Sequence, residues 1–458
     1  MDNALQVLTI AYLSEIITLT DVLSEHDGFI WFHNGPETPS GLEWFSAWPT
    51  ETYQYLGNQK CRISSGSNEV ITVDSDFFEL LKQKAPCLEF ADLPHFTGGL
   101  AGHLNYELGS ELLNLNSPIS AMNQPIATVG LYHWACCIDH NAKTISVYIR
   151  PECPEVIRQQ VVEWVHALPN ESIQRARPKR ENLNWNCSMS IVHYREAFNA
   201  IKKYIYDGDI YQANLTRQWS CITKNSPWVN YQLLINSMSA PFSFYHSTPE
   251  TKVMSVSPER FIQVNDHLIL TQPIKGTRPR GQSAEEDTLL KNELSSSKKD
   301  QAENLMIVDL LRNDMAKNAV PGTVKVEKLF ELQTFKNVHH LVSSIHATKK
   351  PSVHPIDVLK DAFPGGSITG APKKRAMEVI NEVEPVPRGQ YCGSAFFMSF
   401  EGYLDSSILI RTMSQNDETL VCSGGGGIVY DSQLESEYKE SDLKIRRLLD
   451  ALSDNQIN

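Results

Sequence analysis

Two patterns of apolar and polar residues predict two kinds of element along the chain. Runs with strand-like spacing at 29–32 and 144–149 predict strands in the first third. Apolar spacing of three and four residues predicts helices over 192–206, 300–317, 373–383 and 435–452. Further apolar runs predict strands over 267–271, 395–400, 406–412 and 419–422. Because strands and helices do not alternate regularly, the pattern favours an α+β fold over a doubly wound sheet.

A polar segment, 168–190, is the clearest boundary in the chain. It contains proline and several arginines and has no apolar period, so we interpret it as a linker. It separates an N-terminal region, 1–170, from a larger region, 187–453. The length of 458 residues allows up to three domains, or one large fold with an accessory region.

Composition excludes several classes of protein. The chain has 41 basic and 54 acidic residues, a net charge of −13, and no basic block, so neither nucleic acid nor an anionic membrane surface is expected as a partner. No apolar run is long enough to span a membrane, and the first residues do not resemble a signal peptide. The nine cysteines are scattered and never spaced C-x-x-C, which favours a reducing cytoplasm over a disulfide framework or a zinc site.

Two pairs of carboxylates lie in predicted helices. Asp300 and Glu303 are three residues apart, as are Glu437 and Glu440, so each pair shares one helix face. If the two faces met, their oxygens would suit a hard cation such as Mg²⁺. The alternative is two solvated faces, with Glu440 and Lys444 forming an ordinary surface pair.

A lysine and two glycine-rich segments are further candidates for chemistry. Lys275 follows an apolar run and precedes Gly-Thr, which fits either a desolvated nucleophile or a lysine in a basic turn. The glycine run 423–427 and the small-residue segment 365–373 could both present backbone N–H groups to an anion. Neither has the spacing of a phosphate-binding loop.

Ten motifs in a fixed order resemble the chorismate-binding enzymes. In chain order they are GDIYQANLTR, SPERF, PIKGTRPRG, AENLMIVDLLRND, HHLVS, GSITGAPK, YCGS, ILIRT, GGGGI and ESEYKES. The series as a whole is far more specific than any single motif. The resemblance implies one large α+β unit of two packed antiparallel β-sheets flanked by helices, with the active site between the sheets.

The resemblance also implies roles for individual residues. Mg²⁺ would be held by the carboxylates of Glu303, Glu437 and Glu440, with Asp300 where relatives often carry glutamate. The substrate, chorismate, would be bound by residues that hold its carboxylates or line its pocket, namely Tyr391, Arg411, the backbone of Gly427, Lys444, Ser367, Thr277 and His340. Glu259 matches the residue that protonates the leaving C4 hydroxyl. That role requires a raised pKa, through burial or neighbouring carboxylates.

Three features favour the aminodeoxychorismate synthases within this family. Gln212 stands where relatives that use water as the nucleophile have a general-base lysine, which ammonia does not need. Lys275 stands in PIKGT, where anthranilate synthases usually read PIAGT, and is implied to add covalently to the ring. No amidotransferase motif with a nucleophilic cysteine is recognisable in the chain, so ammonia is expected from a separate glutamine amidotransferase subunit.

The N-terminal region resembles the part of the family that binds tryptophan. Its nearest match is the segment Phe32-His33-Asn34-Gly35. Tryptophan bound there is a feedback signal in anthranilate synthases, whereas here the strands could simply complete the sheets. Two other hypotheses remain open at this point. One is anthranilate synthase component I, and the other is a catalytically silent protein that binds tryptophan or regulates a partner.

Overall fold

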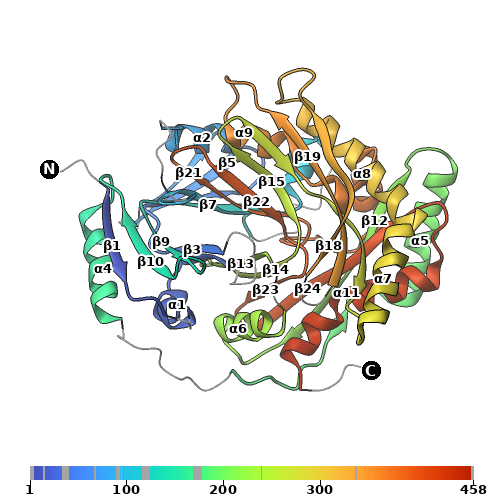
Figure 1. Cartoon of the computed structure of the whole chain (residues 1–458), viewed down its shortest axis with the longest axis horizontal. Helices are drawn as coiled ribbons and strands as arrows, with labels where there is room; N and C mark the ends of the chain where they lie inside the picture. The colour runs from blue at the N-terminus through green and yellow to red at the C-terminus, as the bar shows by residue number, and fades with distance from the viewer. Residues whose placement is uncertain are drawn as a thin grey trace.

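Two twelve-stranded antiparallel β-sheets organise the chain in the computed structural model (Figure 1). The structure describes residues 5–13, 16–33, 41–66, 69–88, 93, 95–115, 124–168, 178–238, 240–335 and 338–454. The expected α+β class, with two packed antiparallel sheets and flanking helices, is confirmed.

The first sheet contains strands from both predicted regions. In spatial order they are β1 (Gln6–Ile10), β10 (Thr144–Ile149), β9 (Trp134–Asp139), β3 (Leu42–Ser46), β2 (Ile30–His33), β13 (Phe242–Ser247), β14 (Lys252–Ser257), β23 (Thr412–Asn416), β24 (Thr419–Ile428), β12 (Gln212–Ile222) and β11 (Asn186–Cys187), with β20 (Gly370–Ala371) beside β12. The pairing of β2 with β13 joins the N-terminal and C-terminal regions within this sheet.

The second sheet is mixed in the same way. Its order is β17 (Ile274–Pro279), β19 (Val338–Thr348), β16 (Leu268–Thr271), β15 (Arg260–Asn265), β22 (Leu404–Ile408), β21 (Ser394–Ser399), β7 (Gly99–Leu104), β8 (Ala127–Tyr132), β4 (Glu51–Tyr55), β5 (Lys60–Ser65) and β6 (Val70–Asp74), with β18 (Lys325–Thr334) beside β19. Here β21 pairs with β7, so the regions 1–170 and 187–453 contribute strands to each sheet.

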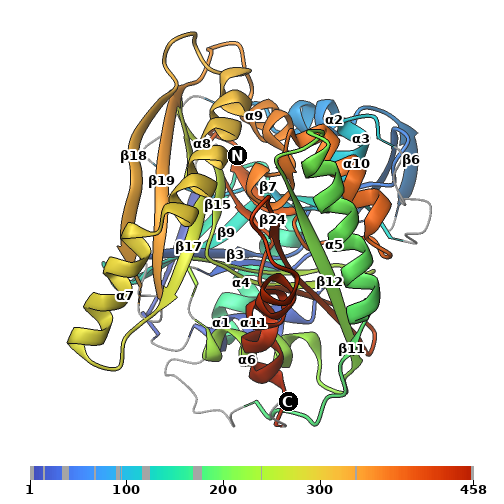
Figure 2. The same cartoon turned by 90° about the vertical axis from the view of Figure 1, so that its right-hand side faces the viewer.

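Helices cover the outer faces of the sheets (Figures 1 and 2). They are α1 (Ile17–Ser24), α2 (Phe77–Lys84), α3 (Leu108–Leu112), α4 (Glu155–Ala167), α5 (Ile191–Tyr206), α6 (Pro227–Ser237), α7 (Ala284–Ser296), α8 (Lys298–Ala316), α9 (Pro355–Ala362), the short 3-10 helix η2 (Gly366–Ile368), α10 (Lys373–Val383) and α11 (Leu434–Leu452). None of the described helices is long and apolar enough to cross a membrane.

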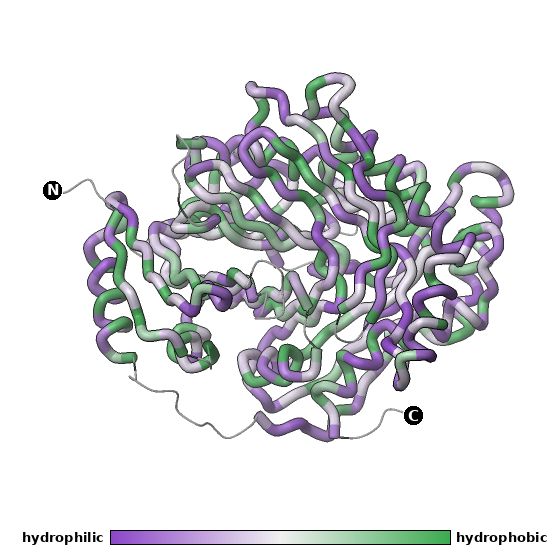
Figure 3. The backbone as a smooth tube through the Cα atoms, viewed as in Figure 1, coloured by the Kyte–Doolittle hydropathy of each residue, from purple (hydrophilic) through white to green (hydrophobic). Residues whose placement is uncertain are grey.

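The bounds and buried faces of several helices follow from local sequence. Ser190 begins α5 because its hydroxyl accepts the backbone N–H of His193, and Ser297 caps α8 through Asp300 in the same way. Along α4 the tube of Figure 3 alternates between purple and green. Its buried residues Ile157, Val161 and Trp164 recur at helical spacing, so one face packs on the first sheet.

The core between the two sheets is largely aromatic. It is formed by residues of both sheets, including Ile30, Trp44, Phe96, Tyr132, Phe244, Phe397 and Tyr403. One buried polar contact also crosses it, because His103 of β7 and His246 of β13 lie with their Nδ1 atoms 3.0 Å apart. Two larger apolar cores fill the spaces between the sheets and the outer helices.

The predicted elements are largely confirmed, with two corrections. The helix 373–383 and the strand 144–149 have the predicted bounds. The predicted strand 406–412 is wrong, because β22 ends at Ile408 in the second sheet and β23 begins at Thr412 in the first. Arg411, with φ of 51°, turns the chain between the sheets. Of the predicted linker 168–190, residues 169–177 lie outside the described residues; the rest includes β11.

The glycine run 423–427 is the second correction. The residues of this run do not form a separate loop; they belong to β24 and pair with β12. A Cβ at Gly424 would lie 2.3 Å from Ile445 of α11, and one at Gly425 would lie 2.2 Å from the carbonyl of Leu215. The glycines therefore allow α11 and β12 to approach the strand closely.

Candidate active site

Glu259 lies immediately before β15 and is 6% exposed. The hydroxyl of Ser367, in η2, donates a hydrogen bond of 2.8 Å to its Oε1 atom. Burial raises the pKa of Glu259 to about 7, although the Ser367 hydrogen bond and the nearby cations Lys275 and Arg411 oppose the shift. A carboxyl group with this pKa can donate a proton near neutral pH, as the sequence argument required.

Lys275 lies in an irregularity of β17. The register of β17 against β19 shifts between Ile274 and Thr277, and Gly276 has φ of 82°. The Lys275 side chain is only partly exposed to solvent. Its pKa is lowered, and burial by the surrounding atoms is the largest cause. Lys444 lowers this pKa further, whereas the carboxylates of Glu303, Glu259 and Glu440 partly oppose the shift. The arrangement increases the share of neutral, nucleophilic amine.

Thr277 and His340 face each other across β17 and β19. The Thr277 hydroxyl and the His340 Nδ1 atom are 2.9 Å apart and form a hydrogen bond. Burial lowers the pKa of His340 to about 4, and the charge of Arg411 lowers it further. The imidazole is therefore neutral at physiological pH and supplies hydrogen bonds rather than charge.

Carboxylates of α8 and α11 lie near one lysine, Lys299. Glu437 is buried and accepts a hydrogen bond of 2.7 Å from Ser432, and burial together with Glu440 raises its pKa. Lys299 Nζ lies 3.9 Å from an oxygen of Glu303 and 3.9 Å from an oxygen of Glu437. One ammonium group thus lies within ion-pair distance of one carboxylate from each helix.

The four predicted metal ligands are not equally placed. Asp300 Oδ2 accepts a hydrogen bond of 3.3 Å from Arg278, and Glu440 pairs with Lys444 at 2.8 Å on a half-exposed face. Within the described ranges, no three His, Cys, Asp or Glu side chains lie close enough together to hold a metal ion. The oxygen-only donor set on α8 and α11 fits a hard cation in kind, provided that Lys299 moves aside.

The Arg411 guanidinium is largely buried and has no ion pair or side-chain hydrogen bond with any described residue. Burial and the charge of Arg447, on α11, lower its pKa. The charge of Glu259 partly opposes this shift, so the positive charge of Arg411 is only partly offset by its surroundings and can attract an anion. Arg447 was not predicted, although it lies three residues after Lys444 and hence on the same helix face.

Gln212 and Gly427 lie together at the start of β12 and the end of β24. A Cβ on Gly427 would lie 2.6 Å from Gln212 Nε2, so the amide packs directly on this glycine. Gln212 is fully buried and its Oε1 atom accepts no hydrogen bond from the described residues. Tyr391 lies in the turn before β21; its partly buried phenol has a pKa well above the usual range because of burial.

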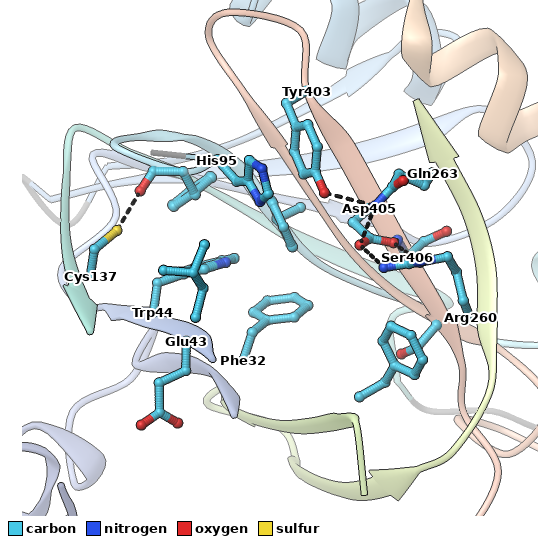
Figure 4. A pocket seen from close by; sticks show the side chains of 15 residues that line it. Phe32, Glu43, Trp44, His95, Cys137, Arg260, Gln263, Tyr403, Asp405 and Ser406 are labelled. Atoms are coloured by element: carbon cyan, nitrogen blue, oxygen red, sulfur yellow. Dashed lines mark hydrogen bonds and ion pairs between the residues drawn. The ribbon is translucent and has the colours of Figure 1, made fainter. Parts of the chain in front are cut away.

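A cavity lies between the sheets, and none of the predicted site residues lines it (Figure 4). Its volume is about 220 Å³. Aromatic side chains form one side, with Trp44 stacked on Phe32 and Phe96 at centroid distances of 4.5 and 4.0 Å. On the other side, Arg260 and Asp405 form an ion pair of 3.0 Å. Of the segment predicted for tryptophan, Phe32 lines this cavity, whereas Asn34 and Gly35 lie outside the described residues.

Comparisons with known proteins agree with the motif series. A family model described as chorismate binding enzyme matches residues 43–450. The chain is 40% identical over 388 residues to aminodeoxychorismate synthase component 1 of Klebsiella aerogenes, covering 84% of each chain. It is 34% identical over 395 residues to anthranilate synthase component 1 of Saccharolobus solfataricus, covering 85% of this chain and 89% of the relative. Anthranilate synthase component I of Streptococcus pneumoniae has a similar structure, with a TM-score of 0.78 at 25% identity over 95% of this chain and 98% of the other.

Proposed function

The chain belongs to the chorismate-binding enzymes, and from this we propose that it is an aminodeoxychorismate synthase component I. It converts chorismate and ammonia to 4-amino-4-deoxychorismate and water. A separate lyase would then release 4-aminobenzoate for folate synthesis. The observation that carries the proposal is Lys275, a surrounded lysine with a lowered pKa that shares its site with Glu259, together with 40% identity to an aminodeoxychorismate synthase.

The chemistry follows from the protonation states of these two residues. The neutral Lys275 amine adds to ring carbon C2, both conjugated ring double bonds shift, and the C4–O bond breaks. Glu259, protonated near pH 7, gives its proton to the departing hydroxyl, which leaves as water. Ammonia then adds at C4, both double bonds shift back, and the C2–N bond breaks, so that the lysine amine is released. The carboxylate of Glu259 accepts the surplus proton of ammonia.

Other residues bind the dicarboxylate and select the nucleophile. Arg411, which forms no ion pair among the described residues, would hold one carboxylate, beside Tyr391 and the backbone of Gly427. The unpaired Oε1 atom of Gln212 can accept a hydrogen bond from ammonia but is too weak a base to activate water.

We propose that Glu303, Glu437 and Glu440 hold Mg²⁺ after Lys299 moves aside, with Asp300 as an outer group. When bound, the metal supplies positive charge that stabilises the substrate carboxylate and the charge that develops as the C4–O bond breaks. A separate glutamine amidotransferase subunit would supply the ammonia. The nine free cysteines suit a reducing compartment, and we place the enzyme in the cytoplasm.

The cavity between the sheets is our proposed tryptophan site. The aromatic side would receive the indole ring, and the Arg260–Asp405 pair would meet the carboxylate and ammonium groups. Calorimetric titration with tryptophan tests this, with Phe242→Ala as the variant because Phe242 lines the cavity. Binding that weakens in the variant supports the site. An absence of binding would mean that these strands serve only the sheets.

Product identification tests the main proposal. The purified chain is incubated with chorismate, MgCl₂ and an ammonium salt, and the product is identified by chromatography and mass. Aminodeoxychorismate, which retains the enolpyruvyl group, is expected. Anthranilate with pyruvate would instead establish the second candidate, anthranilate synthase component I, which the structural likeness to the Streptococcus enzyme favours.

Lys275→Ala tests the covalent step, with the exposed Lys60→Ala as its control. Without ammonium, the wild type should retain a protein adduct with the mass of chorismate less water, and Lys275→Ala should not. The control should behave as the wild type. An unchanged rate in Lys275→Ala would refute the covalent role.

A further inference from the structure

A buried ion pair lies behind the active site, in the segment between α10 and β21. The Nε and Nη2 atoms of Arg388 donate to the two carboxylate oxygens of Glu384, at 2.8 and 2.7 Å. Both side chains are almost fully buried. Neither residue is among the predicted site residues, and the two are four positions apart in a proline-containing stretch.

The remaining hydrogen bonds of Arg388 reach two segments that carry site residues. Its Nη1 atom donates to the carbonyl of Ile368 at 2.9 Å, and its Nη2 atom donates to the carbonyl of Asn214 at 3.2 Å. Ile368 follows Ser367, whose hydroxyl holds Glu259, and Asn214 lies two residues after Gln212. One guanidinium therefore binds both the segment that carries Ser367, the hydrogen-bond partner of Glu259, and the segment that carries Gln212.

The backbone around Arg388 is fixed as well. Its carbonyl accepts the N–H of Tyr391 at 3.2 Å. A buried carboxylate oxygen of Glu107 accepts the N–H groups of Arg388 and Gly389 at 2.8 and 3.1 Å. The ring of Tyr106 lies 4.4 Å from the guanidinium. The guanidinium and the backbone of Arg388 are thus both fixed by buried partners, close in sequence to Ser367, Gln212 and Tyr391.

We propose that Arg388 is a positioning residue for proton donation. By holding the carbonyls of Ile368 and Asn214, it fixes the Ser367 hydroxyl against Glu259. The inference rests on the proposed function, because it assigns Glu259 the role of general acid. It deepens that function by naming a buried group that controls the acid without touching the substrate. A lysine cannot replace Arg388 here, because a single ammonium lacks the planar set of donors that spans Glu384 and two carbonyls.

The test measures kcat against pH for Arg388→Lys, Ser367→Ala and the double variant. Activity falls at high pH as Glu259 loses its proton, and the Ser367 hydrogen bond lowers the pKa of Glu259. Losing a hydrogen bond to a charged group should move this fall upward by about one to two pH units. We expect the same upward shift in both single variants and no further shift in the double variant, because both act through the same bond.

Arg150→Lys is the matched control. Arg150 is also buried and ion-paired, with Glu401 at 2.7 Å, and it hydrogen-bonds Thr97 in the N-terminal region. It should lose a similar amount of thermal stability but keep the wild-type pH profile. An Arg388→Lys variant that loses activity with an unshifted profile would overturn the proposal. If Arg388→Lys does not fold, Glu384→Gln is measured in its place, with the same shift expected.

Product identity is recorded in the same assays. Anthranilate in place of aminodeoxychorismate would refute the proposed function but leave the profile shift as a test of Arg388. An unshifted profile with aminodeoxychorismate as product would refute the positioning role alone.

Discussion

Replacing Glu259 by glutamine should stabilise the protein at alkaline pH while removing most of its activity. The folded protein holds Glu259 with a pKa of about 7, against an ordinary value of 4.5. Folding therefore favours the protonated carboxyl group. This contribution is fully present below pH 4.5 and is lost as the pH rises through 7. Glutamine, which never ionises, does not lose it, and its amide oxygen can still accept the Ser367 hydrogen bond.

The magnitude follows from the difference between the two pKa values. A difference of 7 − 4.5, or about 2.5 units, corresponds to about 3 kcal/mol of unfolding free energy. For a chain of this length the unfolding entropy is about 1 kcal/mol per kelvin, so the melting temperature should differ by about 3 °C. At pH 5 the two proteins should differ little, and at pH 8.5 Glu259→Gln should melt about 3 °C higher.

The assay is thermal unfolding of both proteins in half-unit steps from pH 5 to 8.5. The exposed Glu418→Gln serves as the control and should give a constant offset. The rate of aminodeoxychorismate formation by Glu259→Gln should fall by about 10² to 10⁴-fold, because the proton donor is lost. A difference in melting temperature that stays constant across this range would refute the burial of an ionisable Glu259.

Three further predictions concern other parts of the structure. Lys299→Met should bind Mg²⁺ several-fold more tightly than the wild type in calorimetric titration, because the ammonium no longer competes for Glu303 and Glu437. The neighbouring exposed Lys298→Met should bind Mg²⁺ as the wild type does. Equal affinities in all three proteins would contradict the proposed metal site. Burial lowers the pKa of His103 to about 4, so the His103–His246 contact should lose stability as the pH falls from 6.5 towards 4. As the pH falls over that range, His246→Phe should therefore lose less unfolding free energy than the wild type in denaturant unfolding. Equal losses in the two proteins would refute this. Gly427→Ala should lower kcat with little loss of melting temperature, because its Cβ meets only the side chains of Gln212 and Asn214. Gly425→Ala meets backbone and should mainly unfold, and the reverse order would contradict the packing described.

Local patterns were sufficient where an element stays within one layer. The bounds of α10 and β10 follow from apolar spacing alone. The pattern failed between β22 and β23, because apolar residues continue from Ile408 to Ile410 while the chain crosses from one sheet to the other. It also failed at 423–427, where the glycines serve close approach rather than a turn, and none of these residues has a positive φ.

The candidate site was predictable mainly through resemblance. Spacing alone placed Glu437 and Glu440 on one face but could not say what that face meets. Most of the predicted site residues contact one another or shift one another's pKa. Asp300 and Tyr391 instead contact neighbours of the site, Arg278 and the Arg388 carbonyl respectively. Lys299 and Arg388 were missed because their importance comes from partners distant in sequence, and no local pattern identifies those partners.

The pairing of β12 with β24 has a consequence for folding. Ala213 is opposite Ile428, so these neighbours are separated by most of the C-terminal half of the chain. During synthesis β12 emerges long before its partner, and its edge stays open until β24 and α11 arrive. Closing so large a loop is slow, as in other sheets built from distant segments. The enzyme therefore gains its binding site only in the last steps of folding, and losing α11 from the end of the chain should leave an aggregation-prone sheet rather than a weakened catalyst.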